Sequence, residues 1–326
     1  MRMSELLRIE DFSFSYRHRN TTISILKKLD ILIFPGEVVG LVGESGSGKS
    51  TLAKAILRIP DFKYEVSYKG SIYLNGNDLM QLNDTQLDRI RGNEISIIFQ
   101  DPLSYLNPMF TIHRQIKEVL KHHEIANGIV ADEMIRRCLL NVSFNYPDRI
   151  MRSYPFELSG GMRQRIMICM AMITRPKLLI ADEVTSSLDA LIEKEILDNI
   201  NRLCSDYGTS VLLISHNLPT ILKYANRIAI IYFGHIVEIV HVNNAQKGAR
   251  HPYTKALFSC ALAKVKDGVF PFIEGSIPKP HDVIVGCPFH LRNCPRAIDA
   301  CRTTLPEMES YDEGSFRCHN PYPVEG

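Results

Sequence analysis

The feature that most constrains the fold of this 326-residue chain is the run GESGSGKS at residues 43–50. It follows VVGLV at residues 38–42, an apolar run that predicts a strand buried on both faces. It leads into KSTLAKAILR at residues 49–58, which predicts a helix. A strand, a glycine-rich loop and a helix in this order are the context in which G-x-x-x-x-G-K-[ST] forms a phosphate-binding loop.

The residue types in this loop match the chemistry of a nucleotide's phosphates. Gly43, Gly46 and Gly48 let consecutive backbone N–H groups turn inward around phosphate oxygens. The N-terminus of the helix adds partial positive charge. Lys49 supplies a cation to the β- and γ-phosphates, and Ser50 supplies a hydroxyl for Mg²⁺. A loop that merely turned a strand into a helix would not need every one of these residues, so we predict a site for ATP and Mg²⁺.

Two carboxylates follow a second apolar run, LLIADE at residues 178–183. Asp182 would hold Mg²⁺, and Glu183, one residue further, would polarise an attacking water. Taken alone, two acids at the end of a strand are explained equally well as solvated side chains. Beside a phosphate-binding loop the catalytic interpretation is favoured, because phosphoryl transfer depends on positioning and charge compensation.

Short apolar runs alternate with helical segments through much of the chain. ISIIFQ at residues 95–100, KLLIAD at residues 177–182 and SVLLIS at residues 210–215 each end at a polar residue. This alternation predicts an α/β fold, a P-loop core whose mostly parallel sheet has helices on both faces. Such sheets bind ligands at the C-terminal ends of their strands.

The same pass along the chain predicts its domains. Phe12, Phe14 and Tyr16 alternate with serines and indicate an N-terminal antiparallel β subdomain. Residues 104–171 have helical spacing and are predicted to form a helical subdomain. From residue 243 the composition shifts to Pro, His, Cys and Gly without periodicity. We therefore predict a nucleotide-binding domain at residues 1–242 and a loop-rich C-terminal extension at residues 243–326.

Composition narrows the class of protein. A net charge of +2, from 38 basic and 36 acidic residues, does not favour a phosphate-backbone binder, so no nucleic-acid partner is expected. No apolar run reaches the roughly 18 residues of a membrane span. The first residues, MRMSELLRIEDFSF, carry charges where a signal peptide needs an apolar stretch. We therefore expect a cytosolic chain with reduced cysteines.

Four of the eight cysteines gather near the C-terminus, at Cys287, Cys294, Cys301 and Cys318. In a reduced chain, metal binding explains such a group better than disulfides. The gaps of six, six and sixteen residues are wider than those of zinc fingers and ribbons, whereas iron–sulfur clusters accept loosely spaced thiolates. Three interpretations stay open: a cluster, a zinc site for which His290 or His319 competes as a ligand, and buried thiols without metal.

The run ELSGGMRQR at residues 157–165 resembles the LSGGQ signature of ABC ATPases. The other motifs follow the order of that family: the phosphate loop, Gln100, LSGG, the Asp-Glu pair, SSLD at residues 186–189, and His216. IIFQDPLSYLNPM, RHPYTKAL and the C-terminal GCPFH pattern are similar to the ATP-binding subunits of oligopeptide and dipeptide importers, the peptide/nickel class. This resemblance covers nearly the whole chain. It also points to a [4Fe–4S] cluster, although Asn293 looks like an insertion between the first two cysteines.

In this family two ATPase domains close head to tail on two ATP molecules. The resemblance implies that this chain's own phosphate site includes Ser45, Lys49, Ser50 and Thr51. Gln100 would touch Mg²⁺ or the attacking water, Glu183 would be the general base, and His216 would hold the γ-phosphate.

The resemblance assigns further residues to the closed dimer and to the base. Ser159, Gly160 and Gly161 would contact the γ-phosphate of ATP bound to the partner chain, and Asp189 would bridge the two sites. Tyr16 stands where the family stacks an aromatic ring on adenine; a plain strand aromatic is the alternative.

Two positions depart from the family pattern near the catalytic residues. Val184 stands where the family has proline, and a proline would fix φ and remove a donor. Asn217 replaces the usual aspartate after the histidine. We predict that hydrolysis is slowed but not abolished.

The resemblance implies an ATPase subunit that powers import of oligopeptides or dipeptides across the bacterial inner membrane, from its cytoplasmic face. Implied partners are two transmembrane permease subunits, a second and different ATP-binding subunit, and an extracytoplasmic substrate-binding protein. Nickel-chelates, opines and antimicrobial peptides remain alternative cargoes. The competing class is a soluble ABC ATPase of translation or DNA maintenance. Such proteins often carry two ATPase domains or a long coiled-coil or zinc insertion before the signature, whereas here the interval from Lys49 to Ser159 has no heptad run.

Overall fold

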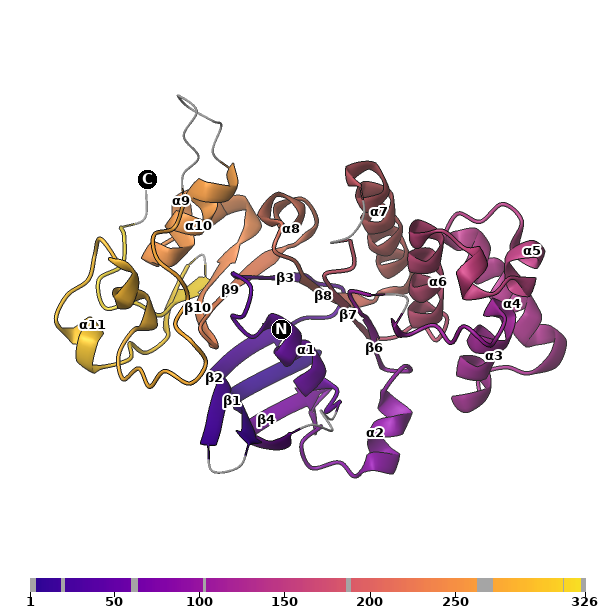
Figure 1. The fold of residues 1–326 in the computed structure, drawn as a ribbon, viewed down its shortest axis with the longest axis horizontal. Coiled ribbons are helices and arrows are strands. Elements are labelled where there is room, and N and C mark those ends of the chain that lie inside the picture. Colours follow the sequence, from indigo (N-terminus) through magenta and orange to yellow (C-terminus); the bar gives the residue numbers. More distant parts are fainter. Residues whose placement is uncertain are drawn as a thin grey trace. The chain divides into compact units, whose positions relative to one another are not determined.

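The computed structural model describes residues 4–18, 21–59, 64–101, 104–185, 189–262, 272–312 and 314–323. They form two compact units, each assembled from separate stretches of the chain (Figure 1). The first unit contains Phe34–Glu37 and Gln81–Leu212, with the N-terminal residues up to Leu6. The second contains Leu7–Ile33, Val38–Met80 and Leu213–Gly326. The phosphate loop therefore belongs to the second unit and the Asp-Glu pair to the first.

The first unit contains a short run of buried strands. Its members are β6 (Ile95–Ile98), β7 (Leu178–Asp182) and β8 (Ser210–Ile214), in the order β8-β7-β6. Strands β6 and β7 are parallel, with Ile97 opposite Ile180. Every residue of β7 and β8 is buried. The three apolar runs thus form strands as predicted, although β6 ends two residues before Gln100. The last two residues of β8 belong to the second unit.

Helices make up most of the rest of the first unit. They are α2 (Asp84–Ile90), α3 (Ile112–His122), α4 (Gly128–Asn141), α5 (Pro147–Arg152), the 3₁₀ turn η2 (Pro155–Glu157), α6 (Gly160–Met172) and α7 (Ala190–Tyr207). Helix α3 begins after Thr111, whose hydroxyl accepts the N–H of Arg114 at 3.4 Å. Elements α3–α6 fill the interval predicted to be helical. The limits of a separate subdomain at residues 104–171 stay a prediction.

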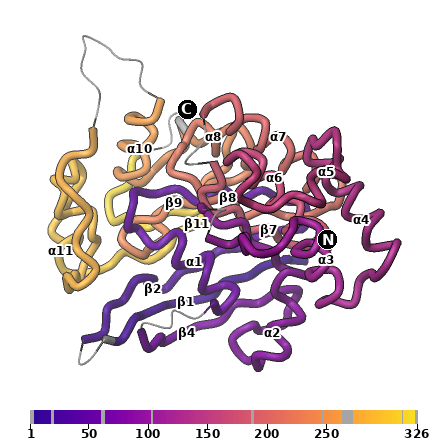
Figure 2. The backbone as a smooth tube through the Cα atoms, turned by 45° about the vertical axis from the view of Figure 1, so that its right-hand side comes forward, coloured from indigo at the N-terminus to yellow at the C-terminus, as the bar shows by residue number. Residues whose placement is uncertain are grey.

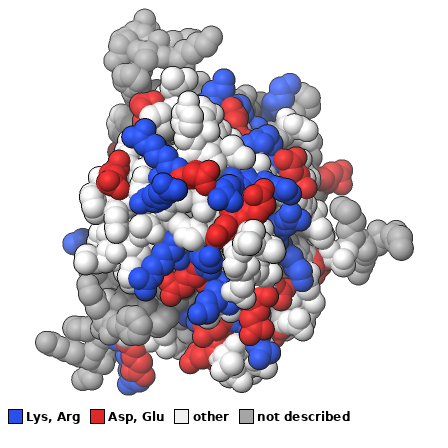
Figure 3. Space-filling view, turned by 90° about the vertical axis from the view of Figure 1, so that its right-hand side faces the viewer, with Lys and Arg blue, Asp and Glu red and all other residues white. Residues whose placement is uncertain are grey.

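Charged side chains of both signs share the surface. On the face shown in Figure 3, Lys and Arg are interspersed with Asp and Glu. In the helical part of the first unit some of them form ion pairs across helices. Nζ of Lys117 in α3 lies 2.7 Å from Oδ1 of Asp132 in α4. Nε of Arg136 in α4 lies 2.8 Å from Oδ1 of Asp148 in α5. These pairs join neighbouring helices, but exposed pairs of this kind contribute only about 0–1 kcal/mol each.

The second unit begins with an antiparallel sheet in the order β2-β1-β4-β5. Its strands are β1 (Leu7–His18), β2 (Thr21–Ile33), β4 (Glu65–Leu74) and β5 (Asn77–Asp78). Phe12 of β1 lies opposite Leu29 of β2, and both are fully buried. The alternation of apolar residues with serines therefore has the predicted cause, since one face of β1 contributes to the core.

A second set of strands in this unit follows the order β11-β12-β10-β9-β3. They are β3 (Val38–Val42), β9 (Arg227–Tyr232), β10 (His235–His241), β11 (Glu309–Tyr311) and β12 (Gly314–Phe316). Strands β3 and β9 are parallel, whereas β9 and β10 form an antiparallel hairpin around Phe233 and Gly234. This part of the sheet is therefore mixed in direction rather than mostly parallel.

The helical elements of the second unit are short. They are α1 (Lys49–Ile56), α8 (Leu218–Tyr224), η3 (Val242–Asn244), α9 (Ala245–Gly248), α10 (Pro252–Leu262), η4 (Pro288–Arg292) and α11 (Ala300–Thr303). No helix in the described ranges is long and apolar enough to cross a membrane. The stretch RHPYTKAL begins α10, in agreement with the sequence-based interpretation of a structural helix start.

The C-terminal extension is mostly loop, as predicted, but it also completes a sheet. Strand β12 pairs antiparallel with β10, with Ser315 opposite Ile239. Figure 2 traces the described part of the extension in orange to yellow. Backbone hydrogen bonds therefore join the extension to β10 of the second unit. The limits of the extension at residues 243–326 stay a prediction.

A buried carboxylate joins the β9–β10 hairpin to α10. Glu238 of β10 is fully buried and accepts the backbone N–H groups of Arg250 at 2.6 Å and His251 at 3.0 Å. These N–H groups lie just before α10, where helices leave donors without intrahelical partners. Burial raises the pKa of Glu238, while the hydrogen bonds from the N–H groups of Arg250 and His251 oppose this shift. The apolar run RIAIIYFGHIVEIV thus contains one acid because the start of α10 needs acceptors.

We expect Glu238→Leu to lower the free energy of unfolding by about 2 kcal/mol, because two buried donors lose their acceptors. Urea unfolding of the full chain measures this change. Glu309→Leu is the matched control, since Glu309 is exposed on β11 and its replacement should change stability by less than about 0.5 kcal/mol. Equal effects of the two substitutions would show that Glu238 does not anchor α10.

Candidate nucleotide site

The phosphate loop takes a conformation that its glycines make possible. Gly46 has φ 82° and Gly48 has φ 110°, both in the left-handed region that other residues rarely adopt. A Cβ on Gly43 would lie 2.2 Å from the carbonyl oxygen of Ile231, so only glycine lets the loop pass this close to β9. Helix α1 begins at Lys49, directly after Gly48. The predicted strand–loop–helix arrangement is therefore confirmed.

The lysine of the loop is held by the loop itself. Lys49 is 5% exposed, and its Nζ donates to the carbonyl oxygens of Gly43 at 2.8 Å and Glu44 at 3.1 Å. Ser45 and Gly46 are exposed at the tip, Ser50 is exposed in the first turn of α1, and Thr51 is half-buried beside it. The loop thus offers a cation, backbone N–H groups and a hydroxyl, which are the groups that a nucleotide's phosphates and Mg²⁺ use.

One contact to the loop was not predicted from the sequence. The backbone N–H of Glu44 donates to the hydroxyl of Tyr253 at 3.1 Å. Tyr253 lies in α10, is fully buried, and has its pKa raised by burial. The sequence offered only an aromatic residue in RHPYTKAL, more than 200 positions away. A residue of the C-terminal part therefore fixes the second residue of the phosphate loop.

Two further predicted residues lie in the second unit. Tyr16 is half-buried in β1, with its ring centroid 4.8 Å from that of Phe14 and 5.2 Å from that of Tyr64. His216 is exposed between β8 and α8. Its neighbour Asn217 caps α8 by accepting the N–H of Thr220 at 3.4 Å. Asparagine and aspartate cap helices about equally well, so this departure keeps the local fold while removing a charge.

The first unit brings two of the predicted catalytic residues, Gln100 and Glu183, together with the predicted Mg²⁺ ligand Asp182, to the end of one sheet. Asp182 ends β7 and is 4% exposed. Glu183 follows in the left-handed region, with φ 47°. Its carboxylate Oε2 accepts a hydrogen bond from Nε2 of Gln100 at 3.2 Å. Val184, which stands where the family has proline, is buried, with 4% of its surface exposed. The carboxamide can therefore orient the carboxylate that we predict to be the general base.

The signature residues lie at the start of helix α6. Ser159 caps α6, and its hydroxyl accepts the N–H of Met162 at 3.4 Å. A Cβ on Gly160 would meet no atom within 4 Å, so the backbone at this end of α6 is open to a ligand. The space around Gly161 is smaller, because a Cβ added there would lie 3.3 Å from the side chain of Ile192 in α7.

Asp189 also caps a helix. Its Oδ1 accepts the N–H groups of Leu191 at 3.1 Å and Ile192 at 3.0 Å, at the start of α7. Capping of α7 is sufficient to explain why an aspartate stands at this position, even without a contact to a partner chain. Its bridging role in a dimer stays a prediction, and the preceding residues 186–188 of the SSLD motif lie outside the described residues.

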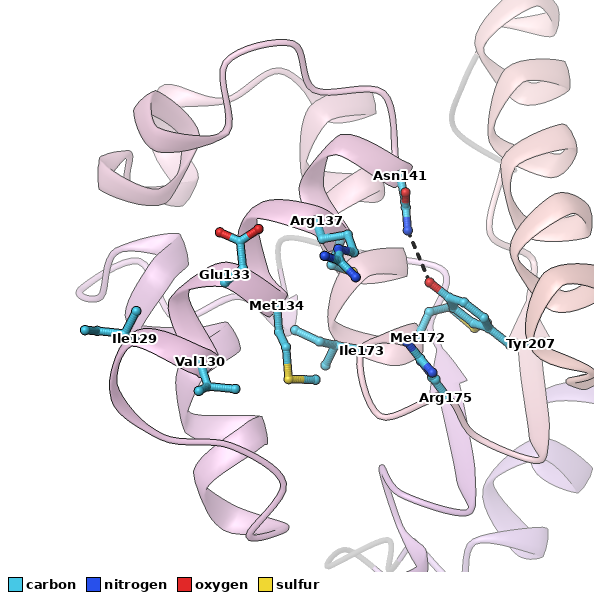
Figure 4. Close-up of a pocket in the computed structure, with 11 residues that line it drawn as sticks. Ile129, Val130, Glu133, Met134, Arg137, Asn141, Met172, Ile173, Arg175 and Tyr207 are labelled. Carbon is cyan, nitrogen blue, oxygen red and sulfur yellow. Dashed lines mark hydrogen bonds between the residues drawn. The ribbon is translucent and has the colours of Figure 1, made fainter.

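The pocket drawn in Figure 4 is separate from these residues. It has a volume of about 380 Å³ and lies between α4, the C-terminal end of α6 and the end of α7. Asn141 donates to the hydroxyl of Tyr207 at 3.2 Å at its edge. Helix α6 has 13 residues and spans about 20 Å, with Ser159 before one end and Met172 at the other. None of the predicted site residues lines this pocket.

The four C-terminal cysteines lie in one region. The N–H of Cys287 donates to the carbonyl oxygen of Cys301 at 2.9 Å. Burial raises the pKa of the Cys287 thiol to about 11 and that of Cys318 to about 12, and neighbouring thiols of the group add to both shifts. Within the described ranges, no three His, Cys, Asp or Glu side chains are arranged to hold a metal ion. The donors suit a soft metal, but their arrangement does not by itself form a metal site.

The residue that looked like an insertion has a defined conformation. Asn293 ends the turn η4 in the left-handed region, with φ 53°. Asparagine adopts this region more easily than most residues. The extra residue therefore closes a turn between Cys287 and Cys294 rather than disrupting it.

Comparison with known sequences matches two parts of the chain to two family models. Residues 26–186 match the ABC transporter family, and residues 237–301 match the oligopeptide/dipeptide transporter C-terminal region. The oligopeptide transport ATP-binding protein AppD of Bacillus subtilis is 38% identical over 320 residues, which is 97% of each chain. The probable peptide ABC transporter ATP-binding protein y4tR of Sinorhizobium fredii is 36% identical over 311 residues, covering 95% of this chain and 92% of y4tR.

Solved structures agree on the fold. The dimeric ATP-binding cassette MJ0796, in a post-hydrolysis state with ADP and phosphate, has a TM-score of 0.64 at 24% identity and covers 72% of this chain and 98% of its own. CbiO1 of Clostridium perfringens, part of an ABC transporter complex, has a TM-score of 0.61 at 20% identity. The match covers 74% of this chain and 90% of CbiO1. At these identities the likeness establishes the fold, and the sequence relatives establish the family. The chain belongs to the ATP-hydrolysing, ATP-binding subunits of ABC transporters, in the class with the oligopeptide/dipeptide C-terminal region.

Proposed function

We propose that this chain is the ATPase motor of a peptide importer and acts on the cytoplasmic face of the inner membrane. The observation that carries the proposal is the presence of both family matches in one chain, the ABC transporter match and the oligopeptide/dipeptide C-terminal match. Relatives of nearly the same length carry names of oligopeptide transport or peptide import proteins. The cargo would be oligopeptides or dipeptides.

Residues predicted from the sequence would each have a separate task in hydrolysis. In the second unit, Lys49 and the loop N–H groups would bind the phosphates of ATP, and His216 would hold the γ-phosphate. In the first unit, Glu183 would accept a proton from the attacking water, with its carboxylate oriented by Gln100 at 3.2 Å. Mg²⁺ would be held by the oxygen donors of Ser50 and Asp182, a donor type that this hard cation prefers, and would neutralise phosphate charge.

A second ATP-binding chain would complete each site. Ser159, Gly160 and Gly161 would present the open start of α6 to the γ-phosphate of ATP on that partner, where helix N-termini favour anions. ATP would favour the closed pair because it adds contacts that exist only there, and hydrolysis would release them. Two transmembrane permease subunits and an extracytoplasmic binding protein would supply the path and the cargo. The second ATP-binding chain would be a different one.

Glu183→Gln tests both the motor and the base. In the complete transporter, reconstituted in vesicles, we expect peptide-stimulated ATP hydrolysis and uptake of labelled peptides to fall by at least about 100-fold, because a general base contributes that much. ATP binding should persist, since the phosphate loop is unchanged. The exposed Glu309→Gln is the control and should leave both rates intact.

The compound that stimulates hydrolysis tests the proposed cargo, and the Glu183→Gln rate tests the assigned base. Hydrolysis stimulated by peptidoglycan fragments but not by linear peptides would replace the proposed cargo with that named for the peptidoglycan transport protein YejF, which is 38% identical over 297 residues, or 54% of its own length. Full hydrolysis by the Glu183→Gln transporter would refute the assigned base.

Val184→Pro tests the departure beside the base. A proline would fix φ at this position and so restrict the turn that carries Glu183. We expect the rate of ATP hydrolysis to rise about two- to fivefold, which corresponds to a barrier lower by about 0.4–1 kcal/mol. Val184→Ala is the control, because it removes buried methyl groups without fixing φ and should give no acceleration. A Val184→Pro transporter with the unchanged wild-type rate would show that this departure does not slow hydrolysis.

We also propose that Cys287, Cys294, Cys301 and Cys318 bind an iron–sulfur cluster, with zinc as the alternative. The support is the gathering of four thiols in one region, in a reduced chain. Anaerobic purification followed by iron, sulfide and zinc analysis tests this. We expect bound iron and visible colour that are lost in Cys301→Ser. A folded, colourless protein free of both metals would leave buried thiols as the explanation, and zinc without iron would select the alternative.

A further inference from the structure

A buried arginine in the cysteine-bearing segment contacts the phosphate loop. Arg292, the last residue of η4, lies between Cys287 and Cys294 and has a side chain that is only 2% exposed. Its Nη1 lies 2.7 Å from Oε1 of Glu44, the second residue of the loop. The two residues are 248 positions apart in the chain but belong to the same unit.

The guanidinium is fixed on its other sides by backbone oxygens. Nε donates to the carbonyl oxygen of Glu274 at 2.8 Å, and Nη2 donates to those of Ile273 at 2.9 Å and Gly275 at 3.0 Å. An arginine with this many fixed contacts cannot swing away without leaving several acceptors unpaired. Its position is therefore set before any nucleotide binds.

Aromatic rings hold the same segment against β9 and α10. Phe289 of η4 packs on Tyr232 at 5.5 Å and on Tyr253 at 5.4 Å between ring centroids. Tyr253 also accepts the N–H of Glu44. The loop residue Glu44 is thus bound twice, through its backbone by Tyr253 and through its carboxylate by Arg292.

We propose that Arg292 is a positioning residue for ATP, which keeps the Glu44 carboxylate away from the phosphates and holds the first turn of the loop in its binding shape. Glu44 is a negative charge inside a loop that binds a polyanion. If it were unpaired, it would repel the phosphates, and like charges a few ångströms apart interact strongly near a protein surface. Arg292 compensates this charge with a cation that solvent does not reach.

The pairing also explains why the loop tolerates an acid at this position. Lys49 donates to the carbonyl oxygen of Glu44, so movement of this residue would shift the lysine as well. When a loop must be ordered before it can bind, its apparent affinity is the intrinsic affinity multiplied by the fraction of molecules that already have the competent shape. Arg292 and Tyr253 together keep that fraction high. The inference rests on ATP binding at this loop and not on the nature of the cargo.

The test is the equilibrium affinity of the full chain for ATP, measured with and without its partner subunits, together with KM and kcat of hydrolysis. We expect Arg292→Leu to weaken ATP binding about tenfold and to raise KM similarly, with kcat changed less than about twofold. Arg292→Lys keeps a positive charge but loses the planar fork. Its affinity for ATP should therefore lie between those of the wild type and Arg292→Leu. It also serves if the leucine variant fails to fold.

Removal of the repelling charge distinguishes positioning from general loss of structure. Adding Glu44→Gln to Arg292→Leu, and to Arg292→Lys, should restore ATP affinity to within about threefold of the wild type, because no unpaired carboxylate remains near the phosphates. A merely structural role of Arg292 would not be rescued by a change in the phosphate loop.

Arg296→Ala is the matched control. Arg296 lies in the same segment, but its guanidinium donates to Asn320, with Nε 2.8 Å from the carbonyl oxygen of that residue, rather than to the phosphate loop. Its removal should leave ATP affinity unchanged. Three results would overturn the proposal: wild-type affinity in folded Arg292→Leu, equal weakening in Arg296→Ala, or no rescue by Glu44→Gln. A transporter that binds ATP normally yet moves no peptide would affect only the proposed cargo.

Discussion

The close approach of the phosphate loop to β9 is the constraint on which the nucleotide site depends. A side chain at Gly43 would collide with the backbone of Ile231, so the loop can pass there only as glycine. Once the chain follows this path, Gly46 and Gly48 turn it into α1 and Lys49 folds back onto Gly43. The loop's shape is therefore built from backbone contacts, and the side chains that bind nucleotide are positioned as a consequence.

Helix starts supply a second recurring element. Ser159, Asp189 and Asn217 were all predicted at or beside functional positions, and each proves to be the N-cap of a helix in the structure. The same physical fact explains both roles, because the first turn of a helix has N–H groups without partners and attracts acceptors, whether from the chain or from a phosphate. A cap can therefore hold a helix end in the shape that a ligand needs.

Local features of the site and fold were predictable from the sequence, because each depends on neighbours in the chain. The strand–loop–helix around residues 43–50 and the strands β7 and β8 follow from apolar runs and turn residues. The hydrogen bond between Gln100 and Glu183 was not predicted, although the resemblance assigned both residues to the catalytic site. The role of Glu238 was not predicted, because an acid in an apolar strand gains meaning only from the N–H groups of Arg250 and His251.

The contacts between the C-terminal extension and the loop could not be predicted, because they join residues more than 200 positions apart. The sequence marked the extension as loop-rich and drew attention to its cysteines. The structure shows that this loop also carries a buried arginine, a central aromatic ring and a strand that pairs with β10. An extension with so little regular structure gains its order from these contacts with the second unit. Since one of them ends on Glu44, changes in the cysteine-bearing segment have a direct route to the phosphate loop.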